Sequence, residues 1–299
     1  MKPFRPIYLF DYVDLFLVGE VTQNALYKSD SLYIPDKNKI ILNKTESGIE
    51  EKILNATSIF IHPDNFADWT FILVNKIAPQ KNKIRLFIFC LTDYCFSNKT
   101  IHTISTMFPD AKFMIQNWIG DLPRIELLPI GVTSICDYLP VEVERTEIFF
   151  ISFVSLNSTE RLKYRDFVYA YPAIQKYMHG FLENKEFLKK MSQHFFTFCP
   201  QGNGFDSYRV WEALACRTVP ILLETSFTRV LQKQYPNLPI IILNEYTDLF
   251  TLIPNLSKER YELMMSNCDL SPVYTDYWIS RLGYNIHPIV NSYSYPSNL

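Results

Sequence analysis

Short apolar runs alternate with amphipathic stretches along most of the chain. Runs of about four to eight apolar residues suit buried strands, and apolar residues spaced three and four apart indicate one face of a helix. The predicted strands are residues 6–10, 39–42, 58–62, 84–90, 111–115, 147–153, 195–198, 219–223 and 239–243. The predicted helices are residues 46–55, 64–77, 99–107, 181–194, 208–216, 245–250, 257–265 and 274–282, with one more around Arg161 and Arg165. This alternation predicts an α/β fold with doubly wound parallel sheets.

A charged stretch without periodicity, PVEVERT at residues 140–146, divides this pattern into two halves. Boundaries between domains fall in exposed, polar linkers of this kind. We therefore expect an N-terminal domain over residues 1–140 and a second domain over residues 147–270. Residues 271–299 are left as a C-terminal segment that contains the last predicted helix.

The most informative stretch reads FFTFCPQGNGFDSYRVWEALACRTVPILL. It predicts a strand, a glycine-bearing turn, a helix with Asp206 as its N-cap, and a second strand. Gly202 and Gly204 allow a ligand to approach the backbone, and Arg209 in the first helical turn can bind a phosphate. Glu212 lies on the same helix face as Arg209, where it could hold the paired hydroxyls of a ribose. The same residues also fit an ordinary Gly/Asn turn followed by an Arg–Glu pair on a surface helix.

Within this stretch the chain resembles a known family. CPQGNGFDSYRVWEALACRTVPIL resembles the CPRGNG…D…R.WEAL..G.IPI signature of the exostosin-like glycosyltransferases, which are glycosyltransferase family 47 and its relatives. NWIGDLPRIELLPIG and FCLTDYC…FPDAKFMIQNW resemble further stretches of the family, so the resemblance covers residues 84–223. Gln201 stands where the family usually has Arg, which removes a possible phosphate contact, and Arg217 stands where it often has Gly.

The resemblance implies the GT-B architecture, in which two Rossmann-like domains face each other across a cleft and a last helix often crosses back to the first domain. It implies an inverting glycosyltransferase that moves a sugar from a nucleotide-sugar donor to a hydroxyl of a glycan acceptor. The family mostly uses UDP-sugars, so the expected donor is a UDP-sugar such as UDP-xylose or UDP-galactose. Two alternatives share the fold: a non-catalytic glycan- or nucleotide-binding member, which the Gln201 departure favours, and a sugar-nucleotide epimerase.

The donor site is expected at strand ends of the second domain. Arg161 follows an Asn/Ser/Thr turn after the predicted strand 147–153, and ligands of doubly wound sheets bind at the carboxyl ends of strands. Arg161 also fits an exposed position on a helix capped by Ser158 or Thr159. The expected donor-binding residues are Asn157, Arg161, Gly202, Asn203, Gly204, Asp206, Arg209, Glu212 and Glu224.

Inversion requires a general base that takes a proton from the acceptor hydroxyl, and this base should project from a strand end of the first domain. Asp93 is the preferred candidate because it follows the predicted strand 84–90 in a loop that resembles a family motif. Asp93 also fits a simple turn former. Asp64 and His62 are the other candidates, although Asp64 also fits a helix N-cap and His62 the packed end of a strand.

Composition narrows the classes of function. The chain has 299 residues, 48% of them hydrophobic, and its net charge of −2 argues against a general nucleic-acid binder. The six cysteines show no CxxC spacing, which favours buried thiols over disulfides or a zinc site. Since no Asp-x-Asp motif follows a predicted strand, we expect a reaction without metal or cofactor, in which Arg161, Arg209 and a helix N-terminus hold the diphosphate.

The first residues of the chain do not resemble a signal peptide, because prolines and aspartates interrupt their apolar stretch. No apolar run reaches the roughly 20 residues that a membrane-spanning helix needs. The resemblance is to members of the family without a membrane anchor, which occur in microbes and large viruses. We therefore expect a cytoplasmic protein, in the host cytoplasm if the source is viral.

Overall fold

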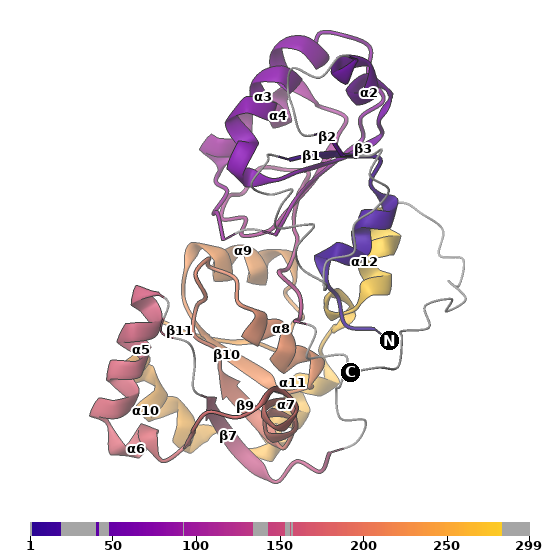
Figure 1. Cartoon of the computed structure of the whole chain (residues 1–299). Coiled ribbons are helices and arrows are strands. Elements are labelled where there is room, and N and C mark those ends of the chain that lie inside the picture. Colours follow the sequence, from indigo (N-terminus) through magenta and orange to yellow (C-terminus); the bar gives the residue numbers. More distant parts are fainter. Residues whose placement is uncertain are drawn as a thin grey trace.

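The computed structural model describes residues 2–18, 40–41, 48–91, 93–133, 143–152, 156 and 158–282. These residues form two parallel β-sheets with helices around them, arranged as two lobes (Figure 1). The fold is therefore α/β with two parallel sheets, as the alternation of apolar runs and amphipathic stretches predicted.

The first sheet has six strands in the order β2-β1-β3-β4-β5-β6, and all neighbouring strands are parallel. The strands are β1 (Leu15–Leu17), β2 (Ile40–Ile41), β3 (Ser58–Ile61), β4 (Leu86–Phe89), β5 (Lys112–Ile115) and β6 (Ile125–Leu127). The helices of this lobe are η1 (Pro6–Tyr12), α2 (Ile49–Asn55), η3 (Pro63–Asn65), α3 (Phe66–Ile72), η4 (Leu73–Ile77) and α4 (Asn98–Met107). Every residue of β3 and β4 is buried, as expected for central strands of a parallel sheet with covered faces.

The second sheet has five strands in the order β11-β10-β9-β7-β8, again parallel throughout. The strands are β7 (Glu147–Ser152), β8 (Met178–His179), β9 (His194–Phe198), β10 (Val219–Leu223) and β11 (Ile241–Leu243). The α-helices that follow β7 are α5 (Thr159–Ala170), α6 (Pro172–Gln175), α7 (Asn184–Ser192), α8 (Tyr208–Ala215), α9 (Ser226–Gln234), α10 (Leu249–Leu252), α11 (Lys258–Ser266) and α12 (Thr275–Arg281). Short 3-10 turns are η6 (Tyr246–Asp248), η7 (Ile253–Asn255) and η8 (Ser271–Val273).

The strand order of the second sheet matches that of the first five strands of the first sheet. In each, the second strand lies on one side of the first, and the later strands continue on the other side. The direction of winding therefore changes between β1 and β3 in the first sheet and between β7 and β9 in the second. Doubly wound proteins bind their ligands beyond the carboxyl ends of the strands at such a switch point.

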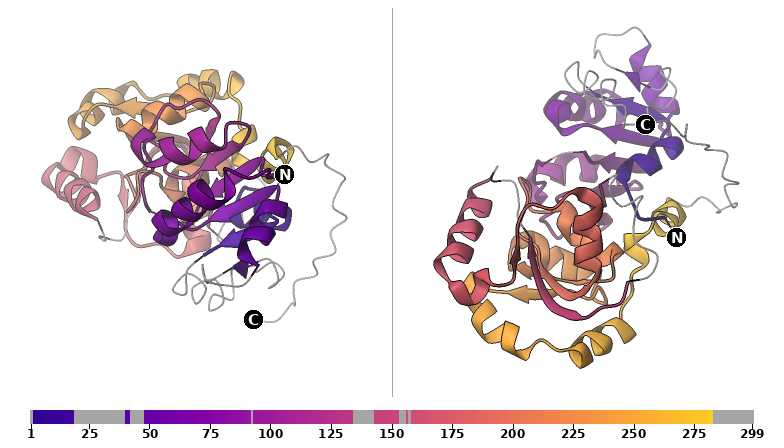
Figure 2. Two further views of the ribbon diagram at one scale, coloured as in Figure 1. Left: turned by 90° about the horizontal axis from the view of Figure 1, so that it is seen from above. Right: turned by 60° about the horizontal axis from the view of Figure 1, so that its bottom comes forward.

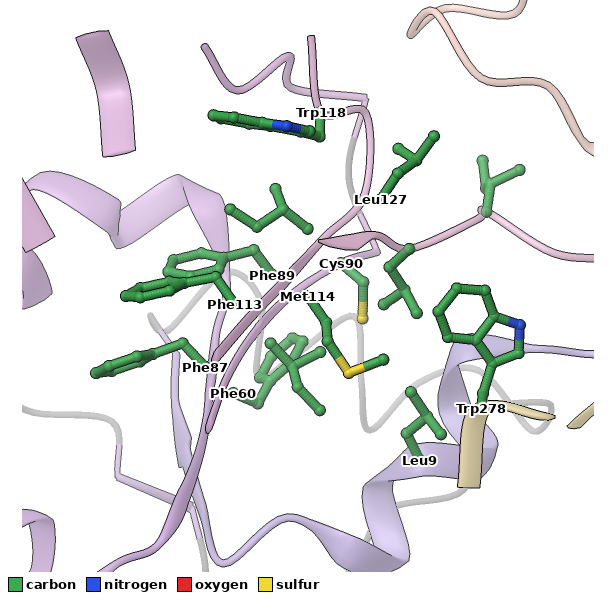
Figure 3. Close-up of a cluster of buried hydrophobic side chains, with 14 of the residues drawn as sticks. Leu9, Phe60, Phe87, Phe89, Cys90, Phe113, Met114, Trp118, Leu127 and Trp278 are labelled. Atoms are coloured by element: carbon green, nitrogen blue, oxygen red, sulfur yellow. The ribbon is translucent and has the colours of Figure 1, made fainter. Parts of the chain in front are cut away.

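One hydrophobic cluster joins the two lobes. It contains the central strands of the first sheet, seen around Phe87, Phe113 and Met114 in Figure 3, together with Trp211 and Leu231 from the second lobe. A smaller cluster packs the opposite side of the second sheet against α5, α10 and α11. The interface between the lobes is thus part of the main core of the protein.

The last helix, α12, lies against the first lobe beside η1 (Figures 1 and 2). The Thr275 N–H donates to the carbonyl of Lys2, and the ring centroids of Phe4 and Trp278 are 5.2 Å apart. Arg281 Nε donates to Glu126 Oε1 on β6 at 2.8 Å. Backbone hydrogen bonds and ring packing therefore join the two ends of the described chain, and an ion pair joins α12 to β6.

Most predicted elements are confirmed, with boundaries shifted by a few residues, and some predictions are wrong. Residues 6–10 form part of the 3-10 helix η1, because Pro6 fixes the backbone angle that the first helical turn needs, and the strand follows as β1. The helix predicted over 181–194 is the shorter α7, and His194 opens β9. The strands β1, β6 and β8 and the helix α9 were not predicted.

Candidate functional site

The loop between β9 and α8 closes on itself and on the first lobe. Gly202 and Gly204 are both buried. A Cβ added at Gly204 would lie 2.7 Å from the side-chain nitrogen of Asn117, and one at Gly202 would lie 2.9 Å from the carbonyl oxygen of Asp206. Both glycines therefore permit close packing within the protein, whereas the neighbouring Asn203 is exposed.

Asp206 is not the side-chain N-cap that the sequence predicted. Ser207 occupies the N-cap position of α8 and makes no side-chain capping bond. The Asp206 carboxylate is 2% exposed and accepts hydrogen bonds from the amides of Ile130 and Ser207 and from Trp211 Nε1. These partners draw the carboxylate into the interface between the lobes, where it ties the loop to the segment after β6.

Two arginines converge at the switch point between β7 and β9. Arg161 lies in the first turn of α5, which Ser158 caps, and its Nε donates to the carbonyl of Gln201 at 3.1 Å. Arg209 donates from Nη1 to the hydroxyl of Ser152, the last residue of β7, and its guanidinium lies 4.0 Å from the ring centroid of Phe187. Strand ends and helix starts thus bring both cations to the carboxyl edge of the sheet.

The charges of these arginines act on each other. Burial lowers the pKa of Arg161, the positive charge of Arg209 lowers it further, and the Asp93 carboxylate raises it. Two like charges in a partly buried site repel each other, and a neighbouring anion relieves this repulsion, as the Glu212 carboxylate does beside Arg209. Guanidinium groups bind phosphate oxygens in pairs of parallel hydrogen bonds, so a diphosphate is a suitable anion.

Glu212 is buried between the lobes. Glu212 Oε2 lies 3.6 Å from Arg209 Nε. Glu212 Oε1 accepts a hydrogen bond from the Thr133 hydroxyl at 2.6 Å. The residue is 4% exposed. A role in holding a ribose stays a prediction, and the contacts in this structure show Glu212 orienting Arg209 and joining it to the first lobe.

A cavity of about 210 Å³ lies beyond the carboxyl ends of β9, β10 and β11, and it is lined in part by Gln201, whose carbonyl oxygen accepts the hydrogen bond from Arg161. Its apolar wall includes Phe205, Val210 and Leu222, and polar groups stand around it. Those polar groups belong to Glu160, Gln201, Glu224, Asn244 and Tyr246. Glu224 is also paired with Arg229 at 2.7 Å. An apolar slot with several hydrogen-bonding groups is suited to a flat heterocycle such as a nucleobase.

The first lobe contributes Asp93 to the same region. Asp93 is exposed in the loop after β4, and its charge acts on Arg161 and on Tyr208 of the second lobe, where it raises the tyrosine pKa that burial has already raised. His62, at the end of β3, is buried, and its Nε2 lies 3.3 Å from the carbonyl oxygen of Leu91. Asp93 therefore lies close enough to Arg161 for their charges to interact, while His62 supports the loop that carries Asp93.

Two predicted site residues cannot be compared with the structure. Asn157 and the side chain of Asp64 lie outside the part of the chain that the structure describes. The backbone of Asp64 belongs to η3, and the N-cap of α3 is Asn65.

Sequence reasoning missed several polar residues that build this region. They are Gln116, Asn117, Thr133 and Ser152. Each lies at or just beyond the end of an apolar run, and a search for polar residues at such positions could have identified them. Their partners lie far away in the sequence, so spacing alone does not identify what they bind.

A larger cavity of about 740 Å³ lies between α9 and α12 at the opposite, amino ends of β5 and β6. Three of its charged residues already form ion pairs with one another, because Lys112 and Arg281 both contact Glu126. We place the candidate site at the carboxyl edge instead, because the two like-charged arginines and both switch-point strands meet there.

In comparisons with known proteins, no family model and no curated protein matched the chain. Within the described residues, no group of three or more His, Cys, Asp or Glu side chains could hold a metal ion. None of the described helices combines the length and the apolar character that crossing a membrane requires.

Proposed function

We propose that the protein is an inverting glycosyltransferase of GT-B architecture that transfers a sugar from a nucleotide-sugar donor, preferably a UDP-sugar, to a hydroxyl of a glycan acceptor. One observation carries the proposal. Arg161 and Arg209 lie at the switch point of the second sheet close enough for their charges to act on each other, and the charge of Asp93 from the first lobe acts on Arg161. A cationic pair suits a diphosphate leaving group, and an exposed carboxylate opposite suits a base.

The proposed reaction uses three parts of the site. The nucleobase occupies the 210 Å³ cavity at the ends of β9, β10 and β11. The Asp93 carboxylate takes the proton of the acceptor hydroxyl as its oxygen bonds to the anomeric carbon from the face opposite the diphosphate. The bond from that carbon to the diphosphate oxygen breaks, and the electron pair leaves with the nucleoside diphosphate, whose charge Arg161 and Arg209 stabilise.

Donor binding can be tested by thermal unfolding with UDP, GDP and CMP, because a ligand that binds the folded state raises the melting temperature. We expect UDP to give the largest shift. Arg161→Ala should weaken UDP binding roughly ten- to a hundredfold, since a hydrogen bond to a charged group contributes about 1.5–3 kcal/mol. Arg165→Ala is the matched control, because Arg165 lies on the same helix but contacts its neighbour Asp166. Equal UDP affinity in both variants would remove the phosphate site from Arg161.

The base is tested by sugar transfer with Asp93→Asn. This variant should keep its affinity for UDP and lose about a hundredfold or more in transfer rate, the usual contribution of a general base. Asp110→Asn, which changes another exposed carboxylate of the first lobe, serves as the control. If the wild-type protein binds UDP but neither transfers nor hydrolyses any UDP-sugar, it is a binding protein and the proposed activity is wrong.

A further inference from the structure

Two consecutive polar residues, Gln116 and Asn117, lie immediately beyond the carboxyl end of β5. Both are buried, with exposed fractions of 1% and 0%. The backbone of Asn117 has φ of +53°, in the left-handed region that asparagine tolerates better than most residues. This turn sends the two neighbouring side chains to different partners.

Gln116 holds the loop that carries Asp93. The side-chain Oε1 of Gln116 accepts a hydrogen bond from the Leu91 N–H at 2.7 Å. The backbone N–H of Gln116 donates to the carbonyl of Phe89 at the end of β4. Leu91 has φ of +63°, a strained value for a leucine. Such a conformation persists only where surrounding contacts fix it. The Gln116 amide and the His62 ring are the contacts that do so here.

Asn117 holds the loop of the second lobe that lies between the arginines and the interface. Its Oδ1 accepts a hydrogen bond from the Asp206 N–H at 2.8 Å, and its amide lies directly against Gly204. The Asp206 carboxylate in turn accepts from the Ile130 N–H of the first lobe at 2.8 Å. The same loop begins at Gln201, whose carbonyl oxygen binds Arg161.

We propose that Gln116 and Asn117 are positioning residues that fix the distance between the Asp93 loop and the donor loop, residues 201–207. The proposal rests on the function proposed above. The two side chains extend from one short turn, so each loop is held relative to the same rigid strand end. A base and a leaving group must be held at a set separation for in-line displacement, and a misplacement of about 1 Å can cost about a hundredfold in rate.

The experiment separates the two roles with Gln116→Ala and Asn117→Ala. Gln116→Ala should lower the rate constant of sugar transfer by about tenfold or more and leave UDP affinity within about twofold, because it removes the hydrogen bond to Leu91 in the Asp93 loop. Asn117→Ala should weaken UDP binding by roughly tenfold, because the donor loop loses a buried hydrogen bond. Amide hydrogen exchange should accelerate around Leu91 in the first variant and in residues 202–207 in the second.

Gln234→Ala is the matched control. Gln234 also bonds across the lobes, to the Leu127 N–H and the Ile125 carbonyl, but on the α9 side of the interface. It should lower the melting temperature while leaving UDP affinity and exchange in both loops unchanged. If Gln234→Ala changes UDP affinity as much as Asn117→Ala does, the effect is general loosening of the lobes and the positioning role is wrong.

Loop exchange provides a readout that does not depend on the proposed function. Unchanged exchange around Leu91 and in residues 202–207 would overturn the positioning role, whatever the protein binds. Accelerated exchange in these loops, in a protein whose wild type binds no nucleotide, would instead support the positioning role and refute the donor site.

Discussion

The buried carboxyl group of Asp206 makes the stability of the protein depend on pH. Burial raises the pKa of this carboxyl to about 7, above its ordinary value of 3.8, although hydrogen bonds from Ile130, Trp211 and Ser207 act in the opposite direction. We compare how the free energy of unfolding changes between pH 5 and pH 8 in the wild-type protein and in Asp206→Asn.

The sign follows from proton binding. Between about pH 4 and pH 7 the folded protein holds a proton on Asp206 that the unfolded chain has released, so the stability from this group falls as pH rises. The contribution is complete below the unfolded pKa and is lost above the folded one. The difference between a pKa of about 7 and the ordinary 3.8 corresponds to about 4 kcal/mol, of which about 2 kcal/mol is lost between pH 5 and pH 7 and about 3 kcal/mol between pH 5 and pH 8.

Other groups titrate in the same range, so a difference measurement is needed. Burial lowers the pKa of His179 and His194, and this makes stability rise as pH rises through their range. These histidines are present in both proteins, and their effect cancels in the comparison. The remaining difference belongs to residue 206.

The assay is urea unfolding of both proteins at pH 5 and pH 8. The variant should be less stable at pH 5, because the Asn NH₂ group cannot accept a hydrogen bond and so leaves one of the N–H groups of Ile130, Ser207 or Trp211 unpaired. Between pH 5 and pH 8 the wild type should lose about 3 kcal/mol relative to the variant. A difference that stays constant, or that grows with pH, would mean that the three N–H donors outweigh burial and keep Asp206 ionised throughout.

Two further predictions concern the packing of the loop and the chemistry of the site. Gly204→Ala should destabilise the protein by about 1–3 kcal/mol because its Cβ would overlap the Asn117 amide, and urea unfolding of Gly204→Ala/Asn117→Ala should show a smaller loss than the sum of the single variants. Sugar transfer should survive excess EDTA because the arginines supply the positive charge, and an activity that EDTA abolishes and manganese restores would contradict this view of the site.

The central unit of the second sheet could be predicted because its signals are local. The apolar run before Pro200, the glycine turn and the apolar run from Val219 lie next to one another in the sequence, and the structure confirms them as β9, a loop and β10 with α8 between. The helix α9 had a comparable signal that was missed. Thr225 forms a capping box with Thr228, and Phe227, Val230 and Leu231 form its buried face.

What the glycines of this unit contact could not be predicted, because their partners are distant in the sequence. Glycine spacing indicates that something approaches the backbone closely, and it does not say what. At Gly204 the approaching group is the side chain of Asn117, from the other lobe. Asp206 shows the same limit, since its position before a helix predicts an N-cap, whereas the partner that fixes its place is Ile130.

The edge strand β6 of the first sheet is where the second lobe binds to the first. An edge strand presents unpaired N–H and C=O groups, and residues of the second lobe form hydrogen bonds with those of β6. Gln234 accepts from the Leu127 N–H and donates to the Ile125 carbonyl, while the Tyr235 hydroxyl donates to the Leu127 carbonyl at 2.7 Å.

These contacts limit how the candidate site can close on a ligand. The segment after β6 is bound to the second lobe through the Ile130 N–H and the Thr133 hydroxyl, and the main hydrophobic cluster continues through it. Rotating one lobe about this segment would break several buried hydrogen bonds and open a packed core, at a cost of about 1–3 kcal/mol for each buried polar group left unpaired. Adjustment to a ligand is therefore confined to the loops at the carboxyl edges of the two sheets, which carry Asp93, Arg161 and the residues between Gln201 and Ser207.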